Sequence, residues 1–174
     1  MHMDKIDAKI LEMLQKDARI PLKQIASEVY LSSPAVSARI ERLEKEGILQ
    51  GYQAIVNPVK LGYHIKAYVN LEISPSQKTE IYPYLKDNPN VLECDCVTGS
   101  YSVIMKVAFP STMELDLFIG ELQHFGKTST QIVFSTVVEN RGVKVMEKKK
   151  ENEIMVDVPA VFWLQACYFS LQIG

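Results

Sequence analysis

The sequence predicts an α+β protein in which a three-helix winged helix-turn-helix domain precedes a βαββαβ, ferredoxin-like domain. Two capped amphipathic segments between Ala18 and Gly47 predict the helix-turn-helix. Near His64 the hydrophobic period changes from 3.6 to 2, which predicts that a sheet begins there. The 174 residues, 47% hydrophobic and 23% charged, suit one or two folded domains and make extensive disorder improbable.

The first two helices are predicted from caps and apolar stripes. Asp4 is placed to cap a helix that ends near residues 17–18, and its stripe is Ile6, Ile10, Leu11, Met13 and Leu14. A second helix is expected over residues 21–30, with Pro21 in its first turn. Its inward face is predicted to carry Ile25, Ala26 and Val29.

The third helix has the clearest boundaries and is predicted to face a nucleic acid. Ser32 or Ser33 can cap it, Pro34 suits its first turn, and Gly47 supplies a left-handed exit. Val36, Ile40 and Leu43 recur on one face, which leaves Pro34, Ser37, Ala38, Glu41 and Arg42 outward. Short side chains near the N-terminus would let this helix enter a major groove, and Arg39 and Arg42 would reach phosphates or guanine. An ordinary helical hairpin with a solvated face is the alternative.

The charge of this region is close to zero. Through Gly62 there are nine cations (Lys5, Lys9, Lys16, Arg19, Lys23, Arg39, Arg42, Lys45, Lys60) and eight acids (Asp4, Asp7, Glu12, Asp17, Glu28, Glu41, Glu44, Glu46). Tight nucleic-acid binding needs several phosphate contacts. We therefore expect one copy to bind weakly and an oligomer to be required.

The predicted domain boundaries follow from changes of pattern. Residues 48–56 alternate as a short strand, and the Asn-Pro and Leu-Gly pairs after them are typical of a linker. We predict a helical domain over 1–50, a strand and linker over 51–63, a second domain over 64–142 and a C-terminal extension over 143–174.

The second domain is predicted to be a split βαββαβ unit. Strands are expected over residues 65–73, 91–97, 101–109 and 131–139, with helices ending at about Asp87 and just before Gly126. In the later helix, Met113, Leu117, Phe118 and Leu122 are expected to face one way. Helices would cover one sheet face, so alternating apolar residues on the other face predict sheet-to-sheet dimerisation.

Four motifs along residues 3–143 resemble the Lrp/AsnC (feast/famine) family of transcription regulators. They are DKIDAKILEMLQKDARIPLKQIA, LSSPAVSARIERLEKEGIL, NPVKLG and VTGSYSVIMKV, in this order. The resemblance implies a DNA-binding domain, a RAM domain that binds an amino-acid effector, and dimers that assemble further to tetramers or octamers. It implies DNA contacts at Ser33, Pro34, Ser37, Ala38, Arg39 and Arg42. It implies an effector loop at Thr98, Gly99, Ser100, Tyr101 and Ser102.

The loop chemistry fits a small ligand, with some departures from the family. Gly99 lets backbone N–H groups approach a carboxylate, and the hydroxyl groups can bond its oxygens. Many family members have acids where this chain has Ser100 and Ser102, so a plain turn without a ligand is the alternative. Pro83 interrupts the expected first RAM helix, which should start late or kink. Beyond Val143, the basic-acidic stretch and the apolar segment after it are not covered by the resemblance.

Other functional classes have weaker signals. We find no carboxylate pair, nucleophile elbow or phosphate-binding glycine loop, and His2, His64 and His124 stand alone, so no enzyme, cofactor or metal site is expected. Cys94 and Cys96 should share one strand face, and we expect them to be buried structural residues. Without a signal-peptide pattern or a long apolar run, a cytoplasmic location is expected. A ligand-binding or assembly protein with a purely structural helix-turn-helix is the remaining alternative.

Overall fold

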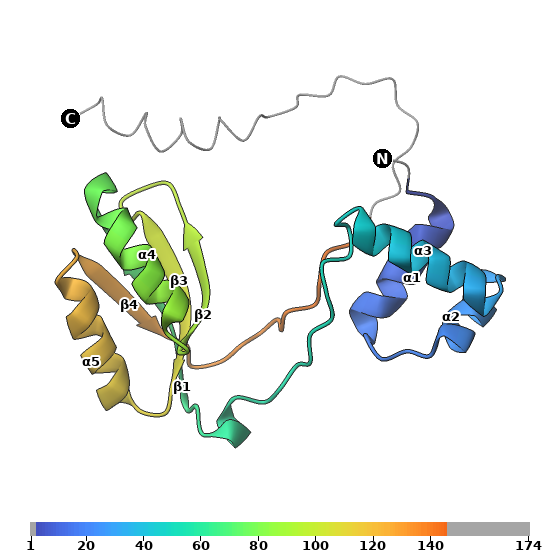
Figure 1. The fold of residues 1–174 in the computed structure, drawn as a ribbon. Coiled ribbons are helices and arrows are strands. Elements are labelled where there is room, and N and C mark those ends of the chain that lie inside the picture. The colour runs from blue at the N-terminus through green and yellow to red at the C-terminus, as the bar shows by residue number, and fades with distance from the viewer. Residues whose placement is uncertain (1–2, 146–174) are drawn as a thin grey trace. The chain divides into compact units, whose positions relative to one another are not determined.

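A computed structural model describes residues 3–145 and divides them into two compact units (Figure 1). One unit contains residues 3–56 and 137–145, and the other contains residues 57–136. The first boundary falls inside the predicted linker. Most of the predicted C-terminal extension, from residue 146 onward, lies outside the described residues.

Three helices form the first unit: α1 (Lys5–Lys16), α2 (Leu22–Val29) and α3 (Ser33–Lys45). Asp4 caps α1, and Ser32 caps α3 by accepting a hydrogen bond from the Ala35 backbone N–H. The predicted inward faces meet in one core of Ile10, Leu14, Ile25, Ala26, Val29, Val36 and Ile40. The three-helix prediction is therefore confirmed.

The ends of α2 differ slightly from the prediction. Pro21 occupies the N-cap position and not the first turn, which starts at Leu22. Tyr30 ends the helix in a left-handed conformation (φ 56°, ψ 41°), and it is the only residue other than glycine with a positive φ in the described chain. For a bulky residue this conformation costs about 1–2 kcal/mol. The tight α2–α3 turn therefore forms at an energetic cost.

The strand predicted at residues 48–56 is wrong. This segment has no regular secondary structure, and Ile55 and Val56 are exposed. A strand needs a neighbour for its backbone hydrogen bonds. Alternation alone is insufficient, and no described strand runs beside this segment.

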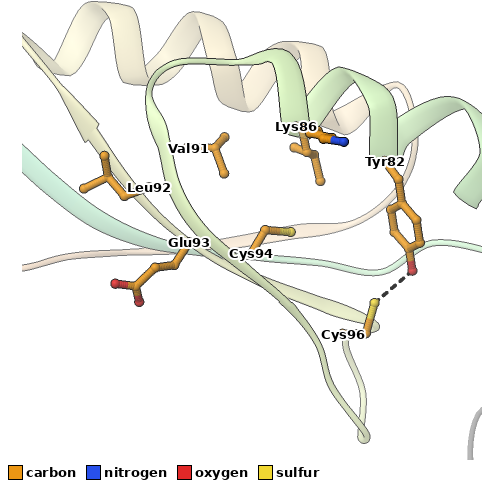
Figure 2. Close-up of a pocket in the computed structure, with 8 residues that line it drawn as sticks. Tyr82, Lys86, Val91, Leu92, Glu93, Cys94 and Cys96 are labelled. Atoms are coloured by element: carbon orange, nitrogen blue, oxygen red, sulfur yellow. Dashed lines mark hydrogen bonds between the residues drawn. The ribbon is translucent and has the colours of Figure 1, made fainter. Parts of the chain in front are cut away.

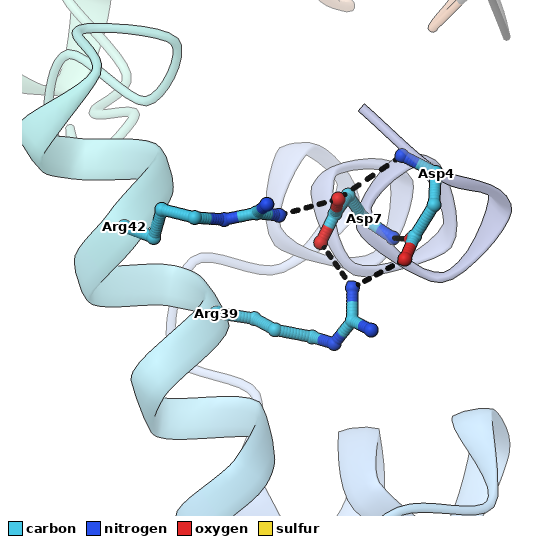
Figure 3. Close-up of polar contacts among 4 residues, drawn as sticks. All are labelled: Asp4, Asp7, Arg39 and Arg42. Carbon is cyan, nitrogen blue, oxygen red and sulfur yellow. Dashed lines mark hydrogen bonds and ion pairs between the residues drawn. The ribbon is translucent and has the colours of Figure 1, made fainter. Parts of the chain in front are cut away.

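An ion-pair cluster ties α3 to the N-terminus of α1 (Figure 3). Arg39 Nη1 lies 2.7 Å from both Asp4 Oδ2 and Asp7 Oδ1, and Arg42 Nη2 lies 2.5 Å from Asp7 Oδ2. Asp4 and Asp7 also form a capping box, because each carboxylate accepts the other residue's backbone N–H. The carboxylates thus lie where the helix dipole favours negative charge.

The cluster shifts the pKa of two of its members. Burial by itself raises the pKa of Asp4, but the Asp7 backbone N–H and the Arg39 guanidinium outweigh burial and hold that pKa below its ordinary value of 3.8. Hydrogen bonds to Asp4 and Asp7 raise the pKa of Arg39 further. Folding therefore favours the charged form of both side chains.

The second unit is a four-stranded antiparallel sheet with helices on one face (Figure 1). The strand order is β2-β3-β1-β4. The strands are β1 (Ile65–Leu71), β2 (Val91–Cys96), β3 (Val103–Phe109) and β4 (Thr128–Ile132), and the helices are α4 (Lys78–Asp87) and α5 (Thr112–Gln123). Short 3-10 turns, η1 (Val59–Leu61) and η2 (Pro75–Gln77), precede β1 and α4. This is the predicted βαββαβ order.

The helices and the inward sheet face enclose one core. The alternation of β1 is confirmed, because Ala67, Val69 and Leu71 are buried. They pack with Ile73, Ile81, Leu85, Val103, Met105, Val107, Phe109, Leu115, Phe118 and Leu122. Pro83 lies inside α4, which begins at Lys78 directly after η2, so the predicted late start at Pro83 is wrong.

Two details of the second unit were predicted incorrectly. The last strand covers Thr128–Ile132 and not residues 131–139, because its ladder with β1 ends at Ile132 and is followed by one bond from the Val133 N–H to the Lys66 carbonyl. In α5 the buried face is Leu115, Phe118 and Leu122, whereas Met113 and Leu117 are exposed. Apolar spacing does not distinguish these faces, since both repeat at helical intervals.

The sheet face opposite the helices is more polar than the prediction assumed. The register places Lys66, Tyr68 and Asn70 of β1 there, together with Ile104 and Lys106 of β3. Lys106 Nζ lies 2.7 Å from Glu93 Oε1, and Asn70 hydrogen-bonds Gln131. Tyr68 and Ile104 thus form a small apolar centre within a polar surround.

We predict that Gly126→Ala destabilises the second unit. A Cβ at Gly126 would lie 1.8 Å from the backbone oxygen of Glu72, so the chain after α5 must move. The expected loss in the free energy of unfolding is about 1–3 kcal/mol, measured by urea denaturation. The matched control is Gly120→Ala in α5, where the Cβ meets nothing within 4 Å. That change should stabilise the helix by about 0.5–1 kcal/mol, and equal effects of both substitutions would contradict the argument.

We also predict that acid weakens the contribution of Asp4 to stability. Because the folded-state pKa of Asp4 is below 3.8, its stabilisation is complete at higher pH and is lost as the pH falls through the folded-state value. Asp4→Asn keeps a capping oxygen but removes the charge. The difference in unfolding free energy between wild type and Asp4→Asn should therefore shrink below about pH 4. Urea titrations at a series of pH values measure this difference, and a constant gap down to about pH 3 would count against the cluster.

Candidate nucleic-acid interface and ligand loop

The N-terminal half of α3 presents short side chains to solvent. Pro34 and Ala38 are exposed, and Ser33 and Ser37 are half-buried. The Ser37 hydroxyl donates to Glu41 Oε1 at 3.1 Å on the next turn. A helix with so little bulk at its start can approach a base-pair edge closely, and hydroxyls can donate to or accept from bases and phosphates.

Arg39 and Arg42 are oriented differently from these four residues. Their side chains run toward α1, where they bond Asp4 and Asp7, and they remain 27% and 41% exposed (Figure 3). From the sequence, Asp4 is predicted only as a helix cap, and no role is predicted for Asp7. The available signal was the pair of acids three residues apart at a helix N-terminus, which is the spacing of a capping box.

The predicted effector loop connects β2 to β3. The Val97 backbone N–H donates to the Ser102 carbonyl at 3.0 Å and closes the hairpin. Thr98, Gly99 and Ser100 lie exposed at its tip. Gly99 has a φ of 117°, which side chains rarely allow, and open space surrounds its Cα. The backbone here is accessible to a small ligand.

Ser102 is held by the protein itself. Its hydroxyl donates to the Ile73 carbonyl at 3.1 Å, and its backbone N–H donates to the Leu71 carbonyl at 3.0 Å. These bonds tie the base of the loop to the end of β1. Ser100 and Thr98 are therefore the loop hydroxyls most available to a ligand.

A hollow of about 340 Å³ lies between α4 and the edge strand β2 (Figure 2). Cys94 and Cys96 face it, and Cys96 Sγ lies 3.0 Å from the Tyr82 hydroxyl. Partial burial, followed by the nearby Cys96 and Asp95, raises the pKa of the Cys94 thiol. Both cysteines are exposed, so the expected burial is wrong. They do share one face, and α4 approaches it, but a hollow separates that helix from β2.

The described residues offer neither a cluster of metal ligands nor a membrane-spanning helix. Across residues 3–145, no group of three or more histidine, cysteine or acidic side chains is arranged to hold a metal ion. In the same part of the chain, no helix combines the length and apolar character needed to cross a bilayer.

Comparisons with known proteins match both units. A family model described as winged helix-turn-helix DNA-binding matches residues 3–50, and one described as Lrp/AsnC ligand binding domain matches residues 66–143. The HTH-type transcriptional regulator FL11 of Pyrococcus furiosus is 32% identical over 146 residues, which cover 82% of this chain and 97% of the relative. The proline dehydrogenase transcriptional activator of Rhodobacter capsulatus is 31% identical, with coverage of 79% and 94%.

Solved structures agree with these relatives. Bacillus subtilis LrpC has a TM-score of 0.75 and 28% identity, covering 79% of this chain and 99% of its own. A feast or famine regulatory protein from M. tuberculosis, solved in complex with L-methionine, has a TM-score of 0.75 and 29% identity, with coverage of 82% and 99%. Since the similarity extends over both units, the chain belongs to the Lrp/AsnC family of transcriptional regulators.

Proposed function

We propose that this regulator reads DNA by laying the N-terminal half of α3 in the major groove. The observation that carries the proposal is the small, accessible surface of Ser33, Pro34, Ser37 and Ala38 directly after the Ser32 cap. Serine hydroxyls suit base edges or phosphates, and Ala38 can contact a thymine methyl group. The sequence also predicts a part for Arg39 and Arg42, and in the structure both guanidinium groups bond acids at the start of α1.

Self-association is part of the same proposal. The nearly neutral charge of the N-terminal region limits what one copy can gain from phosphates. Two linked copies would read two half-sites, and because the second copy then binds intramolecularly, the pair would bind much more tightly than either copy alone. Tyr68 and Ile104, on the uncovered sheet face, supply the apolar centre for such a dimer, and polar groups surround them. Further assembly to tetramers or octamers follows the family pattern.

The loop at residues 98–102 is the proposed effector site. An amino-acid carboxylate would lie against the backbone at Gly99, and the hydroxyls of Thr98 and Ser100 would bond its polar groups. The match of residues 66–143 to a ligand-binding domain supports this role, as does the methionine complex of the M. tuberculosis relative. A ligand that prefers one assembly state would shift DNA affinity without any catalytic step. Such a regulator acts on the genome in the cytoplasm.

The DNA proposal predicts a large effect from one small substitution. Ala38→Glu adds negative charge to the exposed groove-facing surface without removing a core contact. It should weaken binding at least about tenfold, because like charges placed together cost several kcal/mol. Fluorescence anisotropy on a labelled duplex from the region upstream of the protein's own gene measures this change.

The matched control is Ala54→Glu, the same change at an exposed position outside the helices. It should leave affinity within about twofold, since this position is not part of the proposed α3 contact surface and exposed charges are screened by salt. Sedimentation velocity on the same samples reports whether the binding species is a dimer. If wild type binds no duplex at any salt concentration, the DNA-reading proposal fails.

The effector proposal predicts heat when an amino acid is titrated into the protein. L-Methionine is the first probe, followed by the other amino acids, in isothermal titration calorimetry. Ser100→Ala should weaken binding by about two- to tenfold, the worth of one hydrogen bond. Ser135→Ala, at another exposed serine, serves as the control. If no amino acid gives heat, the loop is a plain turn.

A further inference from the structure

Among the described residues, Asp7 is the one buried charged side chain, with 0% exposure. Both of its carboxylate oxygens are engaged by α3: Oδ1 by Arg39 and Oδ2 by Arg42. A buried carboxylate is costly unless cations and donors compensate for lost water. If either arginine moved away from α1, one oxygen of the buried Asp7 carboxylate would lose its cation, and the folded domain would be destabilised.

The charges of this cluster also cancel. Asp4 and Asp7 carry two negative charges, and Arg39 and Arg42 carry two positive charges. Because the net charge of the cluster is zero, it would displace few counterions from DNA on binding, whichever hydrogen bonds it makes. The geometry has the same implication, because the Arg42 guanidinium is directed to Asp7 of α1 (Figure 3).

We propose that Arg39 and Arg42 are positioning residues, which hold α3 at a defined angle on α1 through Asp7 and Asp4 and do not themselves contact DNA. This inference rests on the proposed DNA-reading function and deepens it. Asp4 and Asp7 then contribute to DNA reading indirectly, by holding α3 in place, although both carry the same negative charge as DNA. DNA is contacted by the short residues at the start of α3, and the ion pairs orient them.

Asp7→Asn separates positioning from direct contact. The substitution keeps the shape and a capping oxygen, removes a negative charge and releases Arg42. If Arg42 contacted DNA, binding would be unchanged or tighter, because the domain gains positive charge. If Arg42 positions α3, binding should weaken by about 5- to 30-fold in spite of that gain. The matched control is Glu12→Gln, which changes the charge of α1 equally at an exposed site outside the cluster.

Anisotropy titrations at several salt concentrations compare wild type with Asp7→Asn, Arg42→Gln and the double variant. Positioning predicts that both single variants weaken binding with an unchanged salt slope, and that the double variant is no weaker than either. A loss of about one unit in the slope for Arg42→Gln, with full binding by Asp7→Asn, would overturn the proposal. If wild type binds no duplex, the proposed function fails and this inference fails with it.

Folding is followed by circular dichroism at the temperature of each titration. Should Asp7→Asn not fold, Asp4→Asn takes its place, because Asp4 is 40% exposed and asparagine is an equally good cap. This variant removes one of the two charges that Arg39 bonds and keeps Asp7 intact. Weaker binding at an unchanged salt slope supports the positioning role, and unchanged affinity contradicts it.

Discussion

The burial of Asp7 against two arginines is the constraint on which the helical unit depends. A charge without solvent is tolerated here because the α1 backbone, Arg39 and Arg42 together replace the lost water. Apolar packing favours a set of helix crossing angles with considerable scatter, so it restricts the orientation of α3 on α1 only in part. The ion pairs are directional and close at few relative orientations. In this unit, the hydrophobic core supplies the attraction and the charged cluster specifies the angle.

In the second unit too, apolar packing and polar bonds have separate roles, at the end that carries the loop at residues 98–102. The core of the sheet and its helices is apolar, and the polar bonds concentrate where a loop must be held in place. Ser102 bonds Ile73 through its hydroxyl and Leu71 through its backbone, which anchors the hairpin that carries Gly99. The loop tip above this anchor remains exposed. A rigid base and an accessible tip are what a small-molecule site needs, because ordering the loop on binding then costs less.

The elements that local sequence specifies were predicted well. Caps and turns determine where α3 and α1 begin, and these signals act over three or four residues, so they are readable without a fold. The order βαββαβ follows from the same kind of signal. Apart from the first turn of α2, the failures concern contacts between distant parts of the chain. Residues 48–56 lack a partner strand, the ladder of β4 with β1 ends at Ile132, and Cys94 and Cys96 border a hollow between α4 and β2.

The sequence by itself determined the fold class, the helix-turn-helix, the accessible face of α3 and the position of the glycine loop, because periodicity and capping are local properties. Only the tertiary structure decided what the charged residues of that helix do. Arg39 and Asp7 are 32 residues apart, and Arg42 and Asp7 are 35 apart. Nothing in the local pattern distinguishes an arginine that faces DNA from one that faces a buried carboxylate. That distinction depends on the angle at which two helices pack, and the angle exists only in the folded chain.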